Sequence, residues 1–370
     1  MEEMQNAIIS LIRHCPNLQA FVVDSPMSDS FPPIADALCT YPADSLRTLH
    51  VNIPIIHLAR LIWLLDALPT LTSVFVEFSG QPEETLHLGA ASGLGLTLNI
   101  EHLSLRGYSA DFIDQAIAWE FPKLHTLAFD FITYRDDFPD LMEFLENVGK
   151  RLIELDLNCI PTQDVAAILE LCPLLTTFAF NPDWRLPIEP GNQFSILVNA
   201  PHENITTIGC HQLLHAFGVG YAAAYSGYDP LATQYIRCSN DLNFAAMTKA
   251  NFPNLERIRV LSRSLLRDLE AANGPDLVCF ERWERWSSRC ADEGVRLEDC
   301  TGEELGTLPG TSDDEEQDGD SDEEDAMEVE AYIQPQQDSI SIIRDVLEEC
   351  RRATQSSSRY GANGPYMQAY

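Results

Sequence analysis

The chain has 370 residues, of which 45% are hydrophobic, and its 57 acidic and 23 basic residues give a net charge of −34. A chain this acidic disfavours nucleic-acid phosphates and anionic membrane surfaces as partners. No run approaches the ~20 apolar residues of a membrane helix, and the first residues lack the basic start and apolar core of a secretory signal. The ten cysteines are scattered without a C-x-x-C pair, which favours reduced thiols in a cytoplasmic or nuclear protein.

One short phrase recurs from the first residues onward: L-x-x-Φ-x-Φ, where Φ is apolar and the leading residue is position 1. Copies begin at Leu18, Leu46, Leu71, Ile100, Leu124, Leu152, Leu175, Ile205 and Leu255. The last interval is about twice the others, which predicts a degenerate copy near residue 230. Apolar residues at positions 4 and 6 point to one face of an extended chain, so each copy predicts one strand.

Amphipathic stretches between the copies predict helices. Apolar residues at three- and four-residue spacing occupy 4–15, 55–68, 140–149 and 164–172. Prolines stand where a helix must end before the next strand: Pro16, Pro69, Pro122, Pro173 and Pro253. A strand–helix unit of this size cannot bury its apolar side alone, so neighbouring copies are expected to stack.

The phrases CPNLQAFVV (15–23) and CPLLTTFAF (172–180) resemble leucine-rich repeats of the long variety. The resemblance implies an α/β fold over residues 1–261: a solenoid with a concave parallel sheet and convex helices. The Asn or Cys usual at position 9 is missing, as at Pro26 and Pro54, so we expect irregular loops after the strands. The alternative is an α/β sheet of a different winding.

The chain beyond the repeats divides by composition. Residues 211–227 predict one helix, and 262–305 predict a helical C-terminal cap of two helices closed by a short strand. The acidic stretch 306–336 predicts a disordered linker. Helical apolar spacing returns over 337–352, which predicts an isolated amphipathic helix. The last residues, 353–370, are expected to form a disordered tail.

The sequence contains few motifs that could carry chemistry. His211 and His215 stand four residues apart on the predicted 211–227 helix, a spacing that can bind zinc, but no third ligand accompanies them. The chain shows no Ser-His-Asp grouping, no paired glycosidase-type carboxylates and no dinucleotide fingerprint. We therefore predict that the protein is not an enzyme and has no cofactor and no metal.

The strand pattern instead identifies a surface. Positions 3, 5 and 7 of each copy are expected to point away from the core, onto the concave sheet. Aromatic residues and Arg usually carry protein interfaces, so we predict that a target protein binds there, although ordinary solvated side chains are the alternative. The candidate contact residues are Val22, His50, Phe75, Glu77, Arg106, Asp130 and Asp156.

The acidic linker contains two candidate phosphorylation sites. Ser312 and Ser321 are each followed by an acid at the third position, the pattern of an acidophilic, casein-kinase-type kinase. Phosphates there would strengthen attraction to a basic partner. A plain solvating spacer is the alternative reading of this segment.

Later phrases, among them CFERWERW (279–286) and GVRLEDCTGEELGTLP (294–309), are together with the repeats similar to mushroom-type fungal F-box/leucine-rich-repeat proteins over roughly 1–310. The resemblance implies a substrate receptor of an SCF-type ubiquitin ligase, in which an F-box binds the Skp and cullin components. No L-P-x-E-Φ opening of an F-box is visible. We therefore expect either an F-box upstream of a truncated chain or target binding without ligase coupling. The alternative function is a general scaffold whose acidic tail binds basic proteins such as histones.

Overall fold

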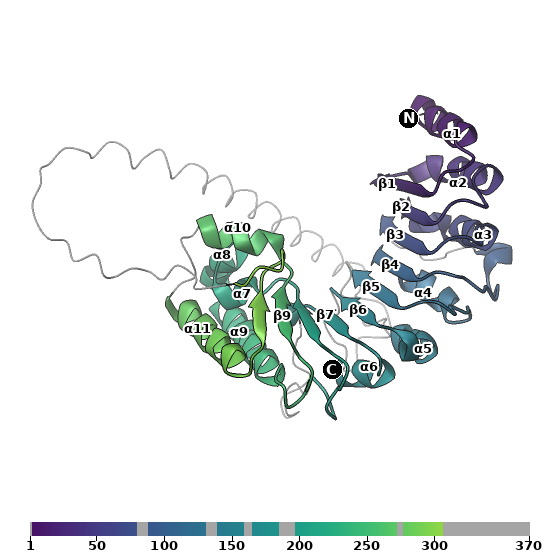
Figure 1. Ribbon diagram of the computed structural model, residues 1–370. Coiled ribbons are helices and arrows are strands. Elements are labelled where there is room, and N and C mark those ends of the chain that lie inside the picture. Colours follow the sequence, from purple (N-terminus) through teal and green to yellow (C-terminus); the bar gives the residue numbers. More distant parts are fainter. Residues whose placement is uncertain are drawn as a thin grey trace, which may run out of the picture. The chain divides into compact units, whose positions relative to one another are not determined.

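Ten parallel strands form one sheet, and their order in the sheet is their order in the chain (Figure 1). The computed structural model describes residues 2–79, 88–130, 139–158, 165–184, 197–271 and 277–305. All of these residues belong to the first of two units of the chain, Met1–Ser312. The strands are β1 (Ala20–Pro26), β2 (Thr48–Pro54), β3 (Ser73–Ser79), β4 (His102–Gly107), β5 (Thr126–Asp130), β6 (Glu154–Leu157), β7 (Thr177–Phe180), β8 (Thr207–Cys210), β9 (Arg257–Val260) and β10 (Arg296–Glu298).

Each of the nine sequence copies forms one strand, which confirms the strand predictions. Every strand from β1 to β9 begins two residues after the leading residue of its copy, as β2 does after Leu46. The tenth, degenerate copy predicted near residue 230 is wrong, because that stretch lies within a helix, α9 (Pro230–Ala246). Its apolar residues follow helical rather than alternating spacing, so no further strand is inserted between β8 and β9.

Helices lie along one side of the sheet (Figure 1). Consecutive helices pack on one another, α1 on α2, α2 on α3, α4 on α5 and α5 on α6. These helices are α1 (Glu2–His14), α2 (Phe31–Thr40), α3 (Leu58–Ala67), α4 (Ala110–Ala116), α5 (Pro139–Val148) and α6 (Val165–Leu171). The 3-10 turns are η1 (Ser28–Ser30), η2 (Ile55–His57), η3 (Gly89–Ala91), η4 (Gly149–Arg151) and η5 (Pro182–Trp184). Four of the six helices match the predicted stretches, and α2 and α4 are additional.

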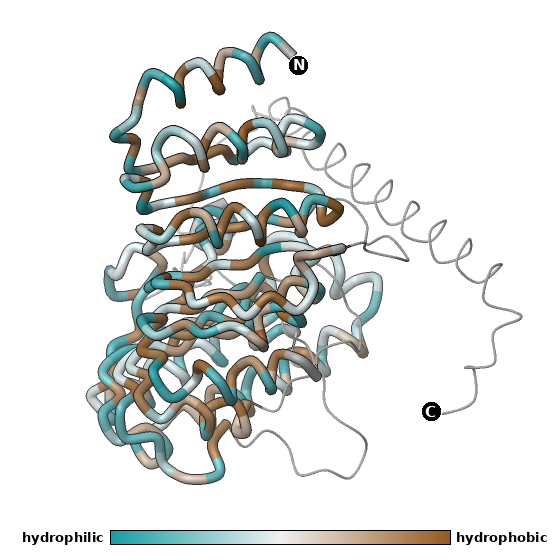
Figure 2. The backbone as a smooth tube through the Cα atoms, turned by 90° about the vertical axis from the view of Figure 1, so that its right-hand side faces the viewer, coloured by the Kyte–Doolittle hydropathy of each residue, from teal (hydrophilic) through white to brown (hydrophobic). Residues whose placement is uncertain are grey.

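The core lies between the sheet and the helices. Positions 4 and 6 of the copies face it, and the six position-4 residues tested are at most 1% exposed: Leu49, Val74, Leu103, Leu127, Leu155 and Phe178. Hydrophobic stretches recur at successive levels of the stack, with hydrophilic residues at the turns (Figure 2). The predicted register of the sheet is therefore confirmed.

The C-terminal part of the unit continues the same sheet. Its helices are α7 (Leu214–Phe217), α8 (Tyr221–Tyr228), α9, α10 (Arg263–Ala271) and α11 (Leu277–Asp292). The helix predicted over 211–227 is wrong as a single element: Gly218 and Gly220 have φ of +66° and +59° and separate α7 from α8. The two helices and the short strand predicted for 262–305 are confirmed, and β10 pairs in parallel with β9.

Several predictions concern residues outside the described ranges. These are the linker 306–336 with Ser312 and Ser321, the helix 337–352 and the tail 353–370. Among the described residues, no helix combines the length and apolar character needed to cross a membrane.

Candidate functional site

The side of the sheet opposite α1–α6 carries positions 3, 5 and 7 of the copies, and we call it the open face. Position 5 forms one row across β1–β6, and position 7 forms a second row across β2–β5. The first row is Val22, His50, Phe75, Ser104, Ala128 and Asp156. The second row is Asn52, Glu77, Arg106 and Asp130. All seven predicted contact residues therefore lie on this face, at the predicted positions.

The beginning of the first row is apolar and exposed. Val22 is 56% exposed and Phe75 is 37% exposed. The ring of His50 stands between them in the register, with its centroid 5.6 Å from that of Phe75. His50 Nε2 lies 3.4 Å from Asp24 Oδ1, so the outer side of this apolar group is polar.

Arg106 is held between two acidic side chains on the strands that flank it. Its Nε donates a hydrogen bond of 2.8 Å to Asp130 Oδ2 on β5, and its Nη1 lies 4.0 Å from Glu77 Oε2 on β3. The Arg106 side chain is 58% exposed. Ion pairs this exposed add little stability, but they fix the direction of the guanidinium group.

A hollow of about 250 Å³ lies on the open face between these groups. Ser104 and Ala128 occupy the middle of the first row, where small side chains leave space between Phe75 and Asp156. Glu77, Arg106, Asp130 and Asn158 also line the hollow. Its wall is therefore aromatic on one side and charged on the other.

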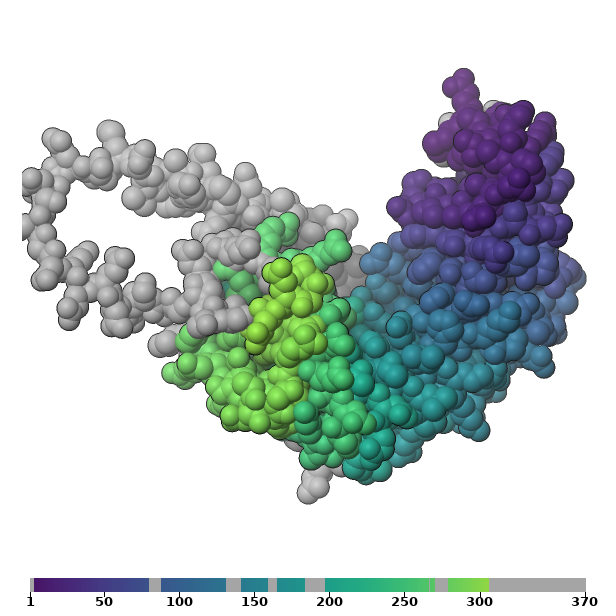
Figure 3. Space-filling view, viewed as in Figure 1, coloured from purple at the N-terminus to yellow at the C-terminus, as the bar shows by residue number. Residues whose placement is uncertain are grey.

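After β6 the first row of the open face is interrupted by two buried residues. Ala179 and Gly209 continue the first row on β7 and β8, but both are buried. A Cβ on Gly209 would come within 2.7 Å of Leu261 Cδ1 and 2.9 Å of Ala179 Cβ. The side chain of Leu261, just after β9, thus covers the row at Gly209. In Figure 3 the coloured surface passes in order from purple to yellow-green, as expected when each strand lies beside the next.

His211 and His215 do not share a helix face. His211 lies before α7, because Gln212 and Leu213 have φ of +62° and +63° and interrupt the helix predicted there. His211 Nε2 lies 2.7 Å from Asp156 Oδ1. His215 is buried against the ring of Tyr221, 5.4 Å between centroids. The pKa of His215 is lowered to about 4, mainly by burial and to a smaller extent by the positive charge of Arg237. His215 is therefore neutral at physiological pH.

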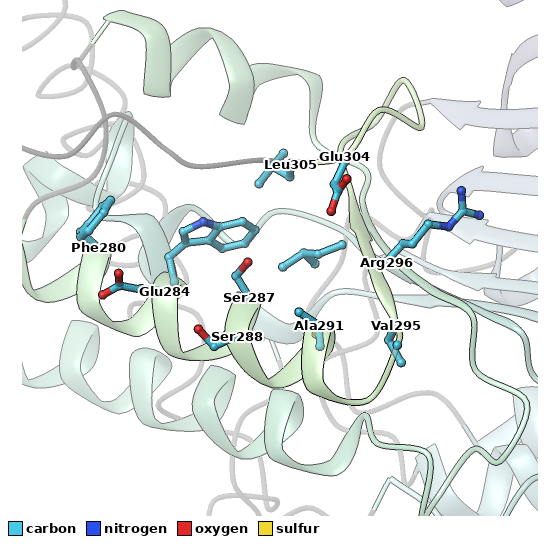
Figure 4. Close-up of a pocket in the computed structure, with 13 residues that line it drawn as sticks. Phe280, Glu284, Ser287, Ser288, Ala291, Val295, Arg296, Glu304 and Leu305 are labelled. Carbon is cyan, nitrogen blue, oxygen red and sulfur yellow. The ribbon is translucent and has the colours of Figure 1, made fainter.

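A second hollow, of about 470 Å³, lies between α11 and β10 (Figure 4). Trp283, Cys290 and Leu297 form much of its apolar lining. Burial raises the pKa of the Cys290 thiol to about 11, so the thiol is protonated and a poor nucleophile at neutral pH. The described residues that line this hollow include no histidine, and we assign it no chemistry.

One cluster of potential metal ligands was missed by sequence reasoning. Glu101, His102 and His125 each offer one ligand atom, and these atoms all lie within 4.8 Å of one another. The signal was present, since Glu101 and His125 occupy position 2 of consecutive copies and His102 occupies position 3. Alignment of the copies would have brought the three together.

No protein-family model matches the chain, and no curated protein matches it. The open face is therefore interpreted from its own residues. It offers an exposed aromatic ring, a shallow hollow and an excess of carboxylates on one sheet, which are features of a surface that binds another molecule.

Proposed function

We propose that the protein is a non-catalytic recognition scaffold of the leucine-rich-repeat type, which binds a target protein on the open face of β1–β6. The observation that carries the proposal is the hollow between Phe75 and Asp156, floored by Ser104 and Ala128. An exposed ring beside a hollow can serve as an anchor at the centre of an interface, with charged groups at its rim. Nine copies that each give one parallel strand, with helices on the other side, support the repeat architecture.

The charges around the hollow favour a basic target. Four carboxylates lie in the two rows or beside them, and Arg106 is the one Lys or Arg side chain among the described residues that line the hollow. The carboxylates are Asp24, Glu77, Asp130 and Asp156. A Lys or Arg side chain of the target could pair with them and pass over the face of Phe75. The overall charge of −34 would also speed the approach of such a target.

We further propose that the captured target is delivered to an SCF-type ubiquitin ligase. This step is supported by the resemblance to fungal F-box proteins rather than by the geometry of the open face. Co-purification with Skp and cullin components would support it, whereas co-purification with histones and without those components would favour a general scaffold.

The open face is tested by an alanine pair of matched exposure. Phe75→Ala removes a ring from the open face, and Trp63→Ala removes one from α3, where Trp63 is 42% exposed on the helix side of the sheet. A target is first isolated by affinity capture with the full chain, purified, and titrated against both variants. We expect Phe75→Ala to weaken binding at least tenfold, and Trp63→Ala to leave it unchanged, with both melting temperatures near that of the original protein. Loss of binding in Trp63→Ala alone would place the site on the helices.

A further inference from the structure

Two histidines and a glutamate meet where β4 and β5 begin. The backbone N–H of His125 donates to the carbonyl of Glu101 at 3.1 Å, so these two residues are neighbours across the strands. His102 follows Glu101 directly, and its ring meets that of His125 edge-on, with 4.7 Å between centroids. All three side chains are half-buried.

Hydrogen bonding determines which nitrogen of His125 is free. The hydroxyl of Thr126 donates its one proton to Glu154 Oε2, at 3.3 Å. The same hydroxyl oxygen lies 3.1 Å from His125 Nδ1 and must therefore accept a hydrogen bond from it. When both hydrogen bonds are formed, Nδ1 carries the proton and the lone pair of Nε2 is available to a metal ion.

We propose that Glu101, His102 and His125 form a binding site for a zinc ion. Two imidazole nitrogens and one carboxylate oxygen are a ligand set of this metal, with water or another ligand in the fourth position. Calcium and magnesium prefer ligands that are all oxygen. Bonds of about 2.0–2.1 Å in a tetrahedral site place ligand atoms roughly 3.4 Å apart. The present separations are within 4.8 Å, so small side-chain rotations close the site.

Thr126 and Glu154 would complete the site as positioning residues. A ligating histidine usually donates its other N–H to an oxygen that is itself hydrogen-bonded, and this fixes the ring and raises its basicity. The chain from His125 through Thr126 to Glu154 supplies that arrangement before any metal binds. Zinc binding at this site needs no partner protein, so it can be tested separately from the proposed recognition of a target.

The experiment titrates tag-free, full-length protein with zinc chloride by calorimetry and counts the bound metal by elemental analysis. We expect His102→Ala and His125→Ala each to lose one equivalent of bound zinc, and Glu101→Gln to bind it more weakly. The matched control is the double variant His50→Ala with His211→Ala, which removes two histidines that each lie near a carboxylate. The control should retain that equivalent. Equal zinc content in His102→Ala and the original protein, or equal loss in the control, would overturn the proposal.

A second readout separates a zinc site from adventitious binding by the thiols of the chain. Cobalt(II) replaces zinc and should give the visible bands of a tetrahedral ion without a thiolate charge-transfer band. Thr126→Val should weaken binding about 10–100-fold by removing the acceptor of His125 Nδ1. Thr177 occupies the same register position on β7, and Thr177→Val should leave zinc affinity unchanged. A thiolate band, or equal affinity in both valine variants, would show that the ion is held elsewhere.

Discussion

His211 Nε2 lies 2.7 Å from Asp156 Oδ1, although 55 residues and the whole of β7 separate the two side chains. Ala179 stands between Asp156 and Gly209 in the register, and its small side chain leaves room for the side chains of Asp156 and His211 to meet. Because the hydrogen bond is short and half-buried, we expect a coupling free energy of about 1 kcal/mol in a double-mutant cycle of His211→Ala and Asp156→Ala. Urea unfolding measures it. The pair His50–Asp24, at 3.4 Å and more exposed, should give a coupling near zero; similar values for both pairs would contradict the prediction.

Side chains are buried on one face of the sheet and exposed on the other, so truncating them should destabilise the protein strongly on the first face and weakly on the second. Leu127 is fully buried against the helices, so Leu127→Ala should lower the free energy of unfolding by about 2–5 kcal/mol. Val22 is 56% exposed on the open face, so Val22→Ala should cost less than about 0.5 kcal/mol. Guanidinium unfolding of both variants provides the comparison. A large cost at Val22 would mean that the open face is covered within the protein itself.

Gly107 ends β4 in a conformation that other residues rarely adopt. Its φ is +77°, and a Cβ there would lie 2.2 Å from the carbonyl oxygen of Phe78. The left-handed conformation alone costs about 1–2 kcal/mol for an L-residue, and the clash with rigid backbone adds to it. We expect Gly107→Ala to destabilise the protein by more than about 2 kcal/mol. Gly227 lies in α8 with open space around it, so Gly227→Ala should be neutral or stabilise the protein by up to about 1 kcal/mol. The melting temperature should therefore fall clearly in Gly107→Ala and stay level or rise in Gly227→Ala.

Asp183 connects η5 to the start of α7. Oδ1 of its buried carboxyl group accepts a hydrogen bond of 2.8 Å from Asn240 Nδ2, and the backbone N–H groups of Leu213, Leu214 and His215 lie near the carboxyl group. These N–H groups converge because Gln212 and Leu213 have positive φ. Burial outweighs the hydrogen bonds and raises the pKa of Asp183 to about 6.

The raised pKa of Asp183 predicts a specific pH dependence. The folded protein binds this proton more tightly than the unfolded chain, whose value is 3.8, so the contribution to stability is present at low pH and is lost as pH rises from about 4 to 6. We expect the free energy of unfolding of the original protein, relative to Asp183→Asn, to fall by at most about 3 kcal/mol between pH 4 and pH 7. Urea unfolding of both proteins at each pH measures this difference, and other carboxylates cancel in it.

His215 opposes Asp183 in the original protein. Its pKa is lowered, so its contribution to stability is lost as pH falls from 6.5 towards 4. The two groups therefore partly cancel between pH 4 and 6, and Asp183→Asn should show a steeper rise of stability with pH than the original protein. Parallel curves for the two proteins would show that Asp183 is ionised throughout.

The repeat pattern predicted the strands well because each copy encodes its own burial. Leu49 and Val51 face the core, and His50 faces outward, by alternation alone. Stacking then brings equal positions of neighbouring copies together, so the two rows of the open face followed from counting residues. The spacing of apolar residues likewise predicted the helices at 58–67 and 165–171.

The failures concern contacts that no single copy encodes. The break between α7 and α8 depends on the positive φ of Gly218 and Gly220, and the backbone at the start of α7 lies near Asp183, far back in the chain. The burial of Gly209 depends on a side chain from beyond the next strand, Leu261. These relationships join distant segments, and hydrophobic spacing carries no information about them.

The sequential strand order has a consequence for synthesis on the ribosome. In the part of the chain that the structure describes, each strand pairs with its neighbours in chain order, the one made before it and the one made after it. β1 and β2 can therefore form their hydrogen bonds while the segment that will become β10 has not yet been translated, and each new copy extends an existing edge. The sheet can therefore grow strand by strand from its N-terminal end. Apart from the outer edge of β1, only the newest strand then presents an unpaired edge, which limits the surface available for misassociation with other nascent chains.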